Sequence, residues 1–308
     1  ACGSIGAIHK GKQIHEEIAS RSMLSKDIML CTAIVDMYAK CGVFGKAREV
    51  FEKLPMRNNI TWNVLISGYV QYGLNDEALH CFFQMRNEGH TPDVITFVCL
   101  CKACGSLRFL QMAEDIHSEV RKRGLLEKDV VLGTALVDMY AKCGVLAKAQ
   151  EVLEELPVRN VISWNTVIAG YAQKGQGFEA MNCFRRMQSE GMLPDEVTLL
   201  CILTACNRSG LLCEAQMLFG NMSREYGIVP NSEHHTCMVV AFGCAGCFDD
   251  AIAVIKVVPS SDYTIWLALL GACRKWGNVK LGRLVFDQIF QVDIMCAAAY
   301  VNKAAIFA

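Results

Sequence analysis

The sequence predicts an all-α fold, a right-handed α-solenoid built from helix-turn-helix repeats. The first observation behind this prediction is that residues 28–129 are followed by a second version of themselves at 130–231, so that positions recur 102 residues later. Residues 35–43 are identical to residues 137–145. The second observation is that apolar residues follow helical spacing, whereas the alternation of a β-strand is absent. Repeats of this size indicate units that stack on their neighbours.

Each 102-residue segment divides at its proline and aspartate positions into parts of 31, 35 and 36 residues, which we call short, standard and long units. The predicted order is a partial long unit 1–27, short 28–58, standard 59–93, long 94–129, short 130–160, standard 161–195, long 196–231, short 232–262, and a divergent, truncated extension 263–308.

Every unit is predicted to hold two helices, and the standard unit 161–195 has the clearest pattern. Each of its two helices has apolar residues at roughly helical spacing. They are Ile162, Trp164, Val167, Ile168 and Tyr171 in the first helix and Ala180, Met181, Phe184 and Met187 in the second. The turn between them is expected at Gly175-Gln176-Gly177. Gly191 is expected to end the second helix, with Pro194 just beyond it.

Composition indicates a folded, soluble chain. Hydrophobic residues make up 53% and charged residues 20% of the 308 residues, enough apolar side chains for a continuous core. No apolar run approaches the roughly 18 to 20 residues that a membrane-spanning helix needs. The formal charge of −1 argues against a polycation that grips phosphates without sequence preference. The seventeen cysteines, without a secretory signal, suggest reduced and mostly buried thiols. No transit peptide opens the chain, so we expect a fragment or a trimmed product.

Short, standard and long units in strict rotation resemble the plant pentatricopeptide repeat proteins of the PLS class. The signatures that carry the resemblance are ALVDMYAKCG at 135–144, ISWNTVIAGY at 162–171 and GKQIH at 11–15. Residues 266–276 resemble the E-type extension motif that follows the last unit in family members devoted to organelle RNA editing. The resemblance implies a non-enzymatic, sequence-specific binder of single-stranded RNA in mitochondria or chloroplasts. It would be a specificity factor for RNA processing or C-to-U editing, with a deaminase or other editing factors in trans, and with no cofactor and no membrane partner.

In this family each unit recognises one base through its fifth and its last residue. Carried onto this chain, the resemblance implies adenine for Thr32 with Asn58 and for Thr134 with Asn160, and uracil for Asn63 with Asp93 and for Asn165 with Asp195; Thr236 with Asp262 hints at guanine. The second residue wedges between bases, which implies Met29, Ile60, Val131 and Ile162. Glu233 stands where the last short unit should have such a wedge. The long units have Val98 and Leu200 at the fifth position and are assigned no base, so the expected target is A-U-any-A-U-any-(G).

Several alternatives were weighed against these assignments. A Thr or Asn that recurs every 102 residues could be a helix cap or a copied surface residue. Trp62 and Trp164 could stack on bases, but their helical register with Ile66 and Ile168 favours core packing. The H-x-E sequences at His15 and His117 lack the Pro-Cys-x-x-Cys of zinc deaminases, so we interpret them as ordinary repeat sequence.

Two other functional classes were considered. A protein-binding scaffold of the tetratricopeptide kind would need 34-residue units with a Trp-x-x-Leu-Gly opening, which this sequence lacks. A zinc site could form from Cys237, Cys244 and Cys247 with His234 or His235, but Cys244 replaces Lys142 of the preceding short unit, so we predict no metal site. No catalytic residue is predicted.

Overall fold

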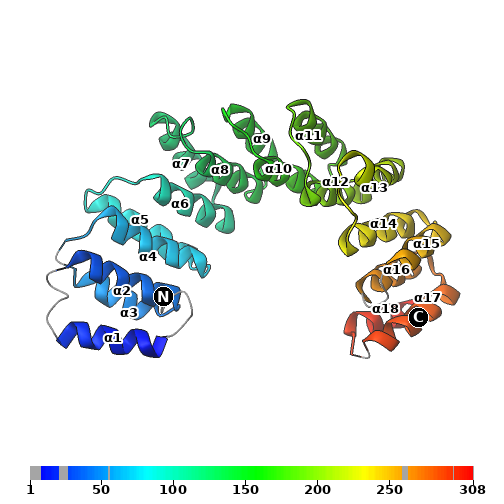
Figure 1. Cartoon of the computed structure of the whole chain (residues 1–308), viewed down its shortest axis with the longest axis horizontal. Helices are drawn as coiled ribbons and strands as arrows, with labels where there is room; N and C mark the ends of the chain where they lie inside the picture. Colours follow the sequence, from blue (N-terminus) through cyan, green and yellow to red (C-terminus); the bar gives the residue numbers. More distant parts are fainter. Residues whose placement is uncertain (1–7, 21–26, 55, 259–262, 294, 308) are drawn as a thin grey trace. The chain divides into compact units, whose positions relative to one another are not determined.

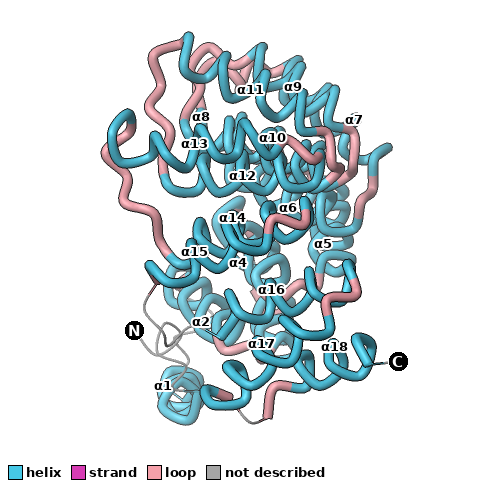
Figure 2. Tube along the Cα trace, turned by 90° about the vertical axis from the view of Figure 1, so that its right-hand side faces the viewer, coloured by secondary structure: helices cyan, strands magenta, loops and turns pink. Residues whose placement is uncertain are grey.

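The computed structural model describes residues 8–20, 27–54, 56–258, 263–293 and 295–307, which form eighteen helices and no strand (Figure 2). The chain divides into two compact units, Ala1–Arg159 and Asn160–Ala308, called here the first and second body. The first body holds α1 (Ile8–Ser20), α2 (Ile28–Lys40), α3 (Phe44–Glu52), α4 (Asn59–Gln71), α5 (Asn75–Asn87), α6 (Val94–Leu107), α7 (Leu110–Lys122), α8 (Val130–Lys142) and α9 (Leu146–Glu155). The second holds α10 (Val161–Gln173), α11 (Gly177–Ser189), α12 (Glu196–Ser209), α13 (Leu212–Glu225), α14 (Ser232–Ala245), α15 (Phe248–Val257), α16 (Tyr263–Trp276), α17 (Val279–Val292) and α18 (Ala297–Phe307).

The helices follow the predicted division of the sequence into two-helix units. The even-numbered helices from α2 to α16 begin at the residues where the units from 28–58 onward were predicted to begin. The described residues of the segment 263–308, which was predicted to be a divergent, truncated extension, form three helices, α16, α17 and α18. The described part of the chain contains no helix that is both long and apolar enough to cross a bilayer.

Helices pack only against near neighbours within each body (Figure 1). In the first body α4 packs against α2 on one side and α6 on the other, and α5 covers the junction of α4 with α6. The second body repeats this pattern, with α11 covering the junction of α10 with α12. Such nearest-neighbour stacking is the packing of an α-solenoid. The predicted all-α fold of stacked helical pairs is therefore confirmed, and its right-handedness stays a prediction.

The residue before each described first helix from α2 to α14 caps that helix. Its side-chain oxygen accepts a hydrogen bond from an N–H of the first turn, which otherwise has no partner within the helix. These residues are Asp27, Asn58, Asp93, Asp129, Asn160, Asp195 and Asn231. Each is the last residue of a predicted unit, so the end of one repeat fixes the start of the next helix.

Glycines end the helices where the sequence predicted. Gly175 (φ 71°) lies between α10 and α11, and Gly191 (φ 76°) follows α11. Both have the left-handed backbone that a residue with a Cβ rarely adopts. Gly68 has a different role, because a Cβ there would lie 2.8 Å from the Cβ of Ala39 on α2. This glycine lets α4 approach α2 closely.

The two tryptophans at the start of the standard units belong to the core. Trp62 and Trp164 are each only 1% exposed. The ring of Trp62 meets that of Phe51 on α3 edge to face, with centroids 4.6 Å apart. The core-packing interpretation is therefore confirmed, and these rings are not available as platforms for bases.

Candidate nucleic-acid interface

An exposed apolar side chain occupies the second position of six consecutive first helices. The four predicted wedge residues, Met29, Ile60, Val131 and Ile162, are 58–69% exposed. Ile95 and Val197 of the long units, which we did not assign as wedges, are 58% and 54% exposed. These six side chains are named here the apolar stripe, and each is described within its own body.

The first helix of the last short unit lacks an apolar side chain at its second position. Glu233, at the second position of α14, is exposed as an acidic side chain instead of an apolar one. The second residues of the long units are therefore as exposed as the four predicted wedge residues.

The fifth residue of the first standard unit lies in a hydrogen-bonded cluster with the start of the next unit. Asn63 on α4 is 6% exposed, and its Nδ2 donates to both carboxylate oxygens of Asp93, at 2.9 Å each. Its Oδ1 accepts from the hydroxyl of Thr96, the third residue of α6, at 2.7 Å. Asp93 also accepts from the backbone N–H of Thr96 at 2.9 Å. Three side chains from two adjacent repeats thus hold one another.

The second standard unit repeats this cluster in the second body. Asn165 is 8% exposed, its Nδ2 donates to Asp195 at 2.9 Å, and its Oδ1 accepts from the Thr198 hydroxyl at 2.6 Å. The carboxylate can only accept hydrogen bonds, so the nitrogen of the amide must face it and the oxygen must face threonine. The Asn and the terminal Asp that the family resemblance paired for uracil are therefore in direct contact in both units.

The ionisation of Asp195 strengthens this arrangement. Partial burial acts to raise the pKa of its carboxyl group, but hydrogen bonds from the Thr198 backbone N–H and from Asn165 Nδ2 help to outweigh burial, and the pKa is lowered. The group is consequently ionised at neutral pH, where a charge-assisted hydrogen bond to the amide is at its strongest.

The fifth residues of the short units are arranged differently. The hydroxyls of Thr32, Thr134 and Thr236 each donate to the carbonyl oxygen four residues earlier, at 2.7, 2.8 and 2.8 Å. All three side chains are half-buried. With its single hydrogen used in this way, such a hydroxyl can offer a ligand only an acceptor.

The last residues of the short units are helix caps. Asn58 Oδ1 accepts from the backbone N–H of Thr61 at 2.9 Å, and Asn160 Oδ1 accepts from that of Ser163 at 2.7 Å. Capping accounts for the recurrence of these residues, as the alternative interpretation proposed.

Not every predicted pair can be examined together. Thr134 belongs to the first body and Asn160 to the second, so each is described by itself. Asp262, the predicted partner of Thr236, lies outside the described residues. Val98 and Leu200 at the fifth position of the long units are half-buried and apolar, in agreement with the absence of a base assignment.

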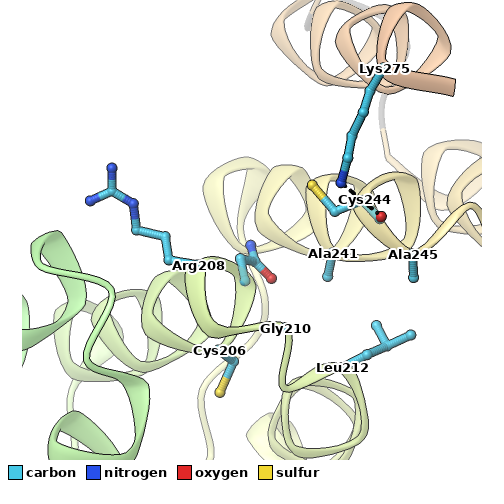
Figure 3. Close-up of a pocket in the computed structure, with 9 residues that line it drawn as sticks. Cys206, Arg208, Gly210, Leu212, Ala241, Cys244, Ala245 and Lys275 are labelled. Atoms are coloured by element: carbon cyan, nitrogen blue, oxygen red, sulfur yellow. Dashed lines mark hydrogen bonds between the residues drawn. The ribbon is translucent and has the colours of Figure 1, made fainter.

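A cavity of about 450 Å³ lies in the second body at the carboxyl ends of α12, α14 and α16 (Figure 3). There Lys275 Nζ donates to the carbonyl oxygen of Cys244 at 3.1 Å, and the Arg208 guanidinium donates to that of Gln173 at 2.6 Å. Both cations satisfy carbonyls near helix ends. Asp195 precedes α12 and Thr236 lies near the amino end of α14, so the cavity lies at the opposite ends of these two helices.

The histidines considered for catalysis join adjacent repeats. His15 and His117 each approach a tyrosine hydroxyl of the following short unit through Nδ1, Tyr38 at 2.9 Å and Tyr140 at 3.1 Å. Burial, the largest influence in both cases, lowers the pKa of each imidazole. Their place in the packing agrees with their interpretation as ordinary repeat residues.

The residues of the candidate zinc cluster do not converge. Within the described ranges, no three His, Cys, Asp or Glu side chains are placed to hold a metal ion. His234 is buried, with Nδ1 2.6 Å from Asn231 Oδ1 and Nε2 3.1 Å from the carbonyl oxygen of Glu196. Both ring nitrogens therefore have protein partners.

Comparison with known families matches the repeats of this chain. A model of the PPR repeat family matches residues 57–106 and 159–208, and a model of the PPR repeat matches residues 30–59 and 134–161. The two matches of the first model are 102 residues apart, as in the sequence repeat.

Curated relatives from Arabidopsis thaliana align with most or all of the chain. Pentatricopeptide repeat-containing protein At4g33170 is 35% identical over 308 residues, which are 100% of this chain and 31% of the relative. The chloroplastic protein At5g50390 is 35% identical over 94% of this chain and 41% of its own length. The mitochondrial protein At1g06140 is 35% identical over 100% of this chain and 55% of its own length. This chain spans between 31% and 56% of the length of the curated relatives compared.

Solved structures share the fold. The pentatricopeptide repeat protein PPR10 in complex with an 18-nt psaJ RNA element superposes with a TM-score of 0.80 at 16% identity, covering 96% of this chain and 45% of that one. PPR10 from maize gives a TM-score of 0.59 at 21% identity, over 91% of this chain and 47% of that one. At these identities the likeness concerns the fold.

Proposed function

Since this chain belongs to the pentatricopeptide repeat proteins of plants, we propose that it binds single-stranded RNA in a sequence-specific manner, with one base at each predicted unit. The observation that carries the proposal is the pair of identical Asn–Asp–Thr clusters, Asn63 with Asp93 and Thr96, and Asn165 with Asp195 and Thr198. Each cluster lies near the amino end of a first helix that also bears a side chain of the apolar stripe. The RNA complex of PPR10 supports the nature of the ligand.

The amide in each cluster is complementary to uracil. An asparagine side chain has two N–H donors and two oxygen lone pairs. In each cluster the carboxylate occupies the donor side and threonine one lone pair, so that the second lone pair of the oxygen can accept from uracil N3–H. Cytosine carries an acceptor at N3, which would face the amide oxygen unfavourably. Asn63 and Asn165 are therefore the residues proposed to select uracil.

The short units are complementary to adenine. The hydroxyl of Thr32 offers an acceptor, because its hydrogen is bonded to the Ile28 carbonyl. Asn58 offers a donor, because its oxygen caps α4. Adenine presents a matching pair on its Watson–Crick edge, the N6 amino donor and the N1 acceptor. Thr134 and Asn160, which stand at the same positions of the next short unit, are proposed to select adenine as well. Thr236 with Asp262 would offer acceptors only, which guanine N1–H and N2–H₂ satisfy.

The order of units gives the target A-U-any-A-U-any-(G), from 5′ to 3′ along the chain. In the long units Ile95 and Val197 extend the apolar stripe, so each of these units is proposed to hold one nucleotide without selecting its base. The relatives named chloroplastic and mitochondrial support action in an organelle. There the chain would be a specificity factor that positions a transcript for processing or for C-to-U editing by a deaminase supplied in trans.

A competition experiment tests the proposal. We expect an RNA with A-U-N-A-U to bind more tightly than one with A-G-N-A-G. Guanine carries an N2 amino group where uracil carries a carbonyl, and this donor would lie beside the Asn Nδ2 group, which is also a donor. The expected cost is on the order of 1–3 kcal/mol per changed base, by analogy with base-edge discrimination in DNA. Fluorescence anisotropy with each RNA as competitor against a labelled A-U-N-A-U strand measures the difference. Equal competition by the two RNAs would rule out base recognition by the standard units.

Replacing Asp93 with asparagine is expected to exchange uracil for cytosine at one position. Asn is as good a helix cap as Asp, so the stability of α6 should be kept. The new amide at position 93 would use its oxygen for the cap and turn its nitrogen toward Asn63. The Asn63 amide must then turn its oxygen toward that nitrogen, which leaves one of its own N–H groups to face the base. Cytosine N3 accepts this donor, and we expect its affinity relative to uracil to rise about tenfold.

Binding of two RNAs that differ by U or C at this nucleotide measures the effect. Asp129→Asn is the matched control, since Asp129 also caps a helix but follows a unit with Val98 at the fifth position. An undiminished preference for uracil in Asp93→Asn would contradict the role given to the carboxylate.

A further inference from the structure

Thr96 and Thr198 stand at the third position of the long units, outside the fifth and last positions to which base recognition has been assigned. We propose that they are positioning residues for uracil recognition by the preceding standard units. Their hydroxyls fix the orientation of the Asn63 and Asn165 amides, so that the amide oxygen faces the base and discriminates uracil from cytosine. The inference rests on the proposed function, and it adds a third position, supplied by the next unit, to the two positions that select one base.

The hydroxyl of each threonine is enclosed by the cluster. Thr96 and Thr198 are both completely buried. Thr96 Oγ1 lies 2.7 Å from Asn63 Oδ1 and 3.0 Å from Asp93 Oδ1, and it accepts from the backbone N–H of Asp93 at 3.2 Å. For Thr198 the corresponding distances, to Asn165 and Asp195, are 2.6, 2.8 and 3.1 Å. A hydroxyl has one hydrogen, and in both clusters the asparagine oxygen is the nearer acceptor.

The contact with asparagine is more than a helix cap requires. Thr61 holds the same third position in α4 and is also completely buried. Its hydroxyl accepts from the backbone N–H of Asn58 at 3.0 Å and donates to the carbonyl oxygen of the same residue at 2.8 Å. Both of these contacts thus lie within the cap of its own helix. At Thr96 and Thr198 the hydrogen instead reaches the fifth residue of the preceding unit, and in both cases that residue is asparagine.

This bond decides how much freedom the recognising amide has. The carboxylate determines which end of the amide faces it, but an amide held at its nitrogen alone can still turn about the Cβ–Cγ bond. The threonine hydroxyl holds the oxygen as well and occupies one of its two lone pairs. The remaining lone pair is then directed at one place. A fixed oxygen favours uracil N3–H and disfavours the N3 acceptor of cytosine, whereas an amide free to turn discriminates less.

The test is the ratio of affinities for two RNAs that differ only by U or C at the nucleotide of the first standard unit. We expect Thr96→Val, which keeps the shape and removes the hydroxyl, to lower this ratio about fivefold, the effect of one neutral hydrogen bond. Thr96→Ser restores the hydroxyl and should restore the ratio. Thr61→Val removes a hydroxyl from a cap of the same kind and should leave the ratio unchanged. Thermal unfolding of each variant verifies that the chains compared are folded.

The outcomes are distinct. A Thr96→Val chain that binds both RNAs more weakly but keeps the wild-type ratio would show a structural role only and overturn the inference, while the proposed function stands. A wild-type chain that binds the two RNAs equally would overturn uracil recognition itself. Thr198→Val with the RNA pair that varies the second uracil repeats the test in the second body, and decides the matter if Thr96→Val does not fold.

Discussion

Replacing Asn63 and Asn165 together with threonine is expected to change the preferred target from A-U-N-A-U to A-G-N-A-G. Thr32, Thr134 and Thr236 show the conformation that a threonine adopts at this position, with the hydroxyl hydrogen bonded to the carbonyl four residues earlier. A threonine at 63 would therefore offer only an acceptor, beside a carboxylate at Asp93 that also only accepts. Guanine presents donors at N1 and N2 and satisfies both groups, whereas uracil has one donor between two carbonyls.

The expected change is large because two bases are affected. Each base should contribute on the order of 1–3 kcal/mol, so the two bases together should change the ratio of the two affinities by at least about thirtyfold. Direct titration of the parent and the double variant with both RNAs measures this ratio. Asn59→Thr is the matched control, because Asn59 lies on the same helix as Asn63 and its amide binds the carbonyl of Thr91. If the double variant still prefers A-U-N-A-U, the fifth residues do not select the base.

Replacing Trp62 with alanine is expected to destabilise the chain by about 3–5 kcal/mol. The indole is almost completely buried between α3 and the rest of its own hairpin, in edge-to-face contact with Phe51. Its removal leaves a cavity at the junction of two repeats, and a solenoid depends on such junctions for its stability. Urea denaturation followed by circular dichroism measures the loss.

Ile60→Ala provides the opposite control on the same helix. The Ile60 side chain is exposed, so we expect its truncation to change stability by less than about 0.5 kcal/mol and to weaken RNA binding instead. A Trp62→Ala chain as stable as the parent would contradict the assignment of the indole to the core. An Ile60→Ala chain with full affinity would contradict a role for the apolar stripe in binding.

Much of the fold could be predicted from the sequence because the residues at helix ends have specific physical roles. Aspartate or asparagine before a helical stripe caps a helix, and Gly175 and Gly191 need a left-handed backbone, so these residues mark element ends without reference to the rest of the chain. The burial of Trp62 followed from its register with Ile66. The bounds of α17 and α18 were not predicted, because the extension lacks the periodicity that the other units share. Handedness does not follow from spacing alone.

The site was only partly predictable for a related reason. The direct contact of Asn63 with Asp93 joins the two positions that the family resemblance paired. The proposed contribution of Thr96 was not predicted, because this threonine belongs to the next unit. Spacing alone does not indicate which side chains of adjacent units meet, and the exposure of Ile95 and Val197 became known only from the structure.

The residue that ends each repeat has two tasks at once, since Asp93 and Asn58 each hold a helix start while taking part in the proposed recognition. Retargeting the chain to another transcript is consequently restricted by folding. Only side chains able to cap, chiefly Asn, Asp, Ser and Thr, can be exchanged there at little cost, and any other residue would sacrifice about 1 kcal/mol per repeat. The choice of residues at this position of an engineered array is thus limited by helix capping before any nucleotide is considered.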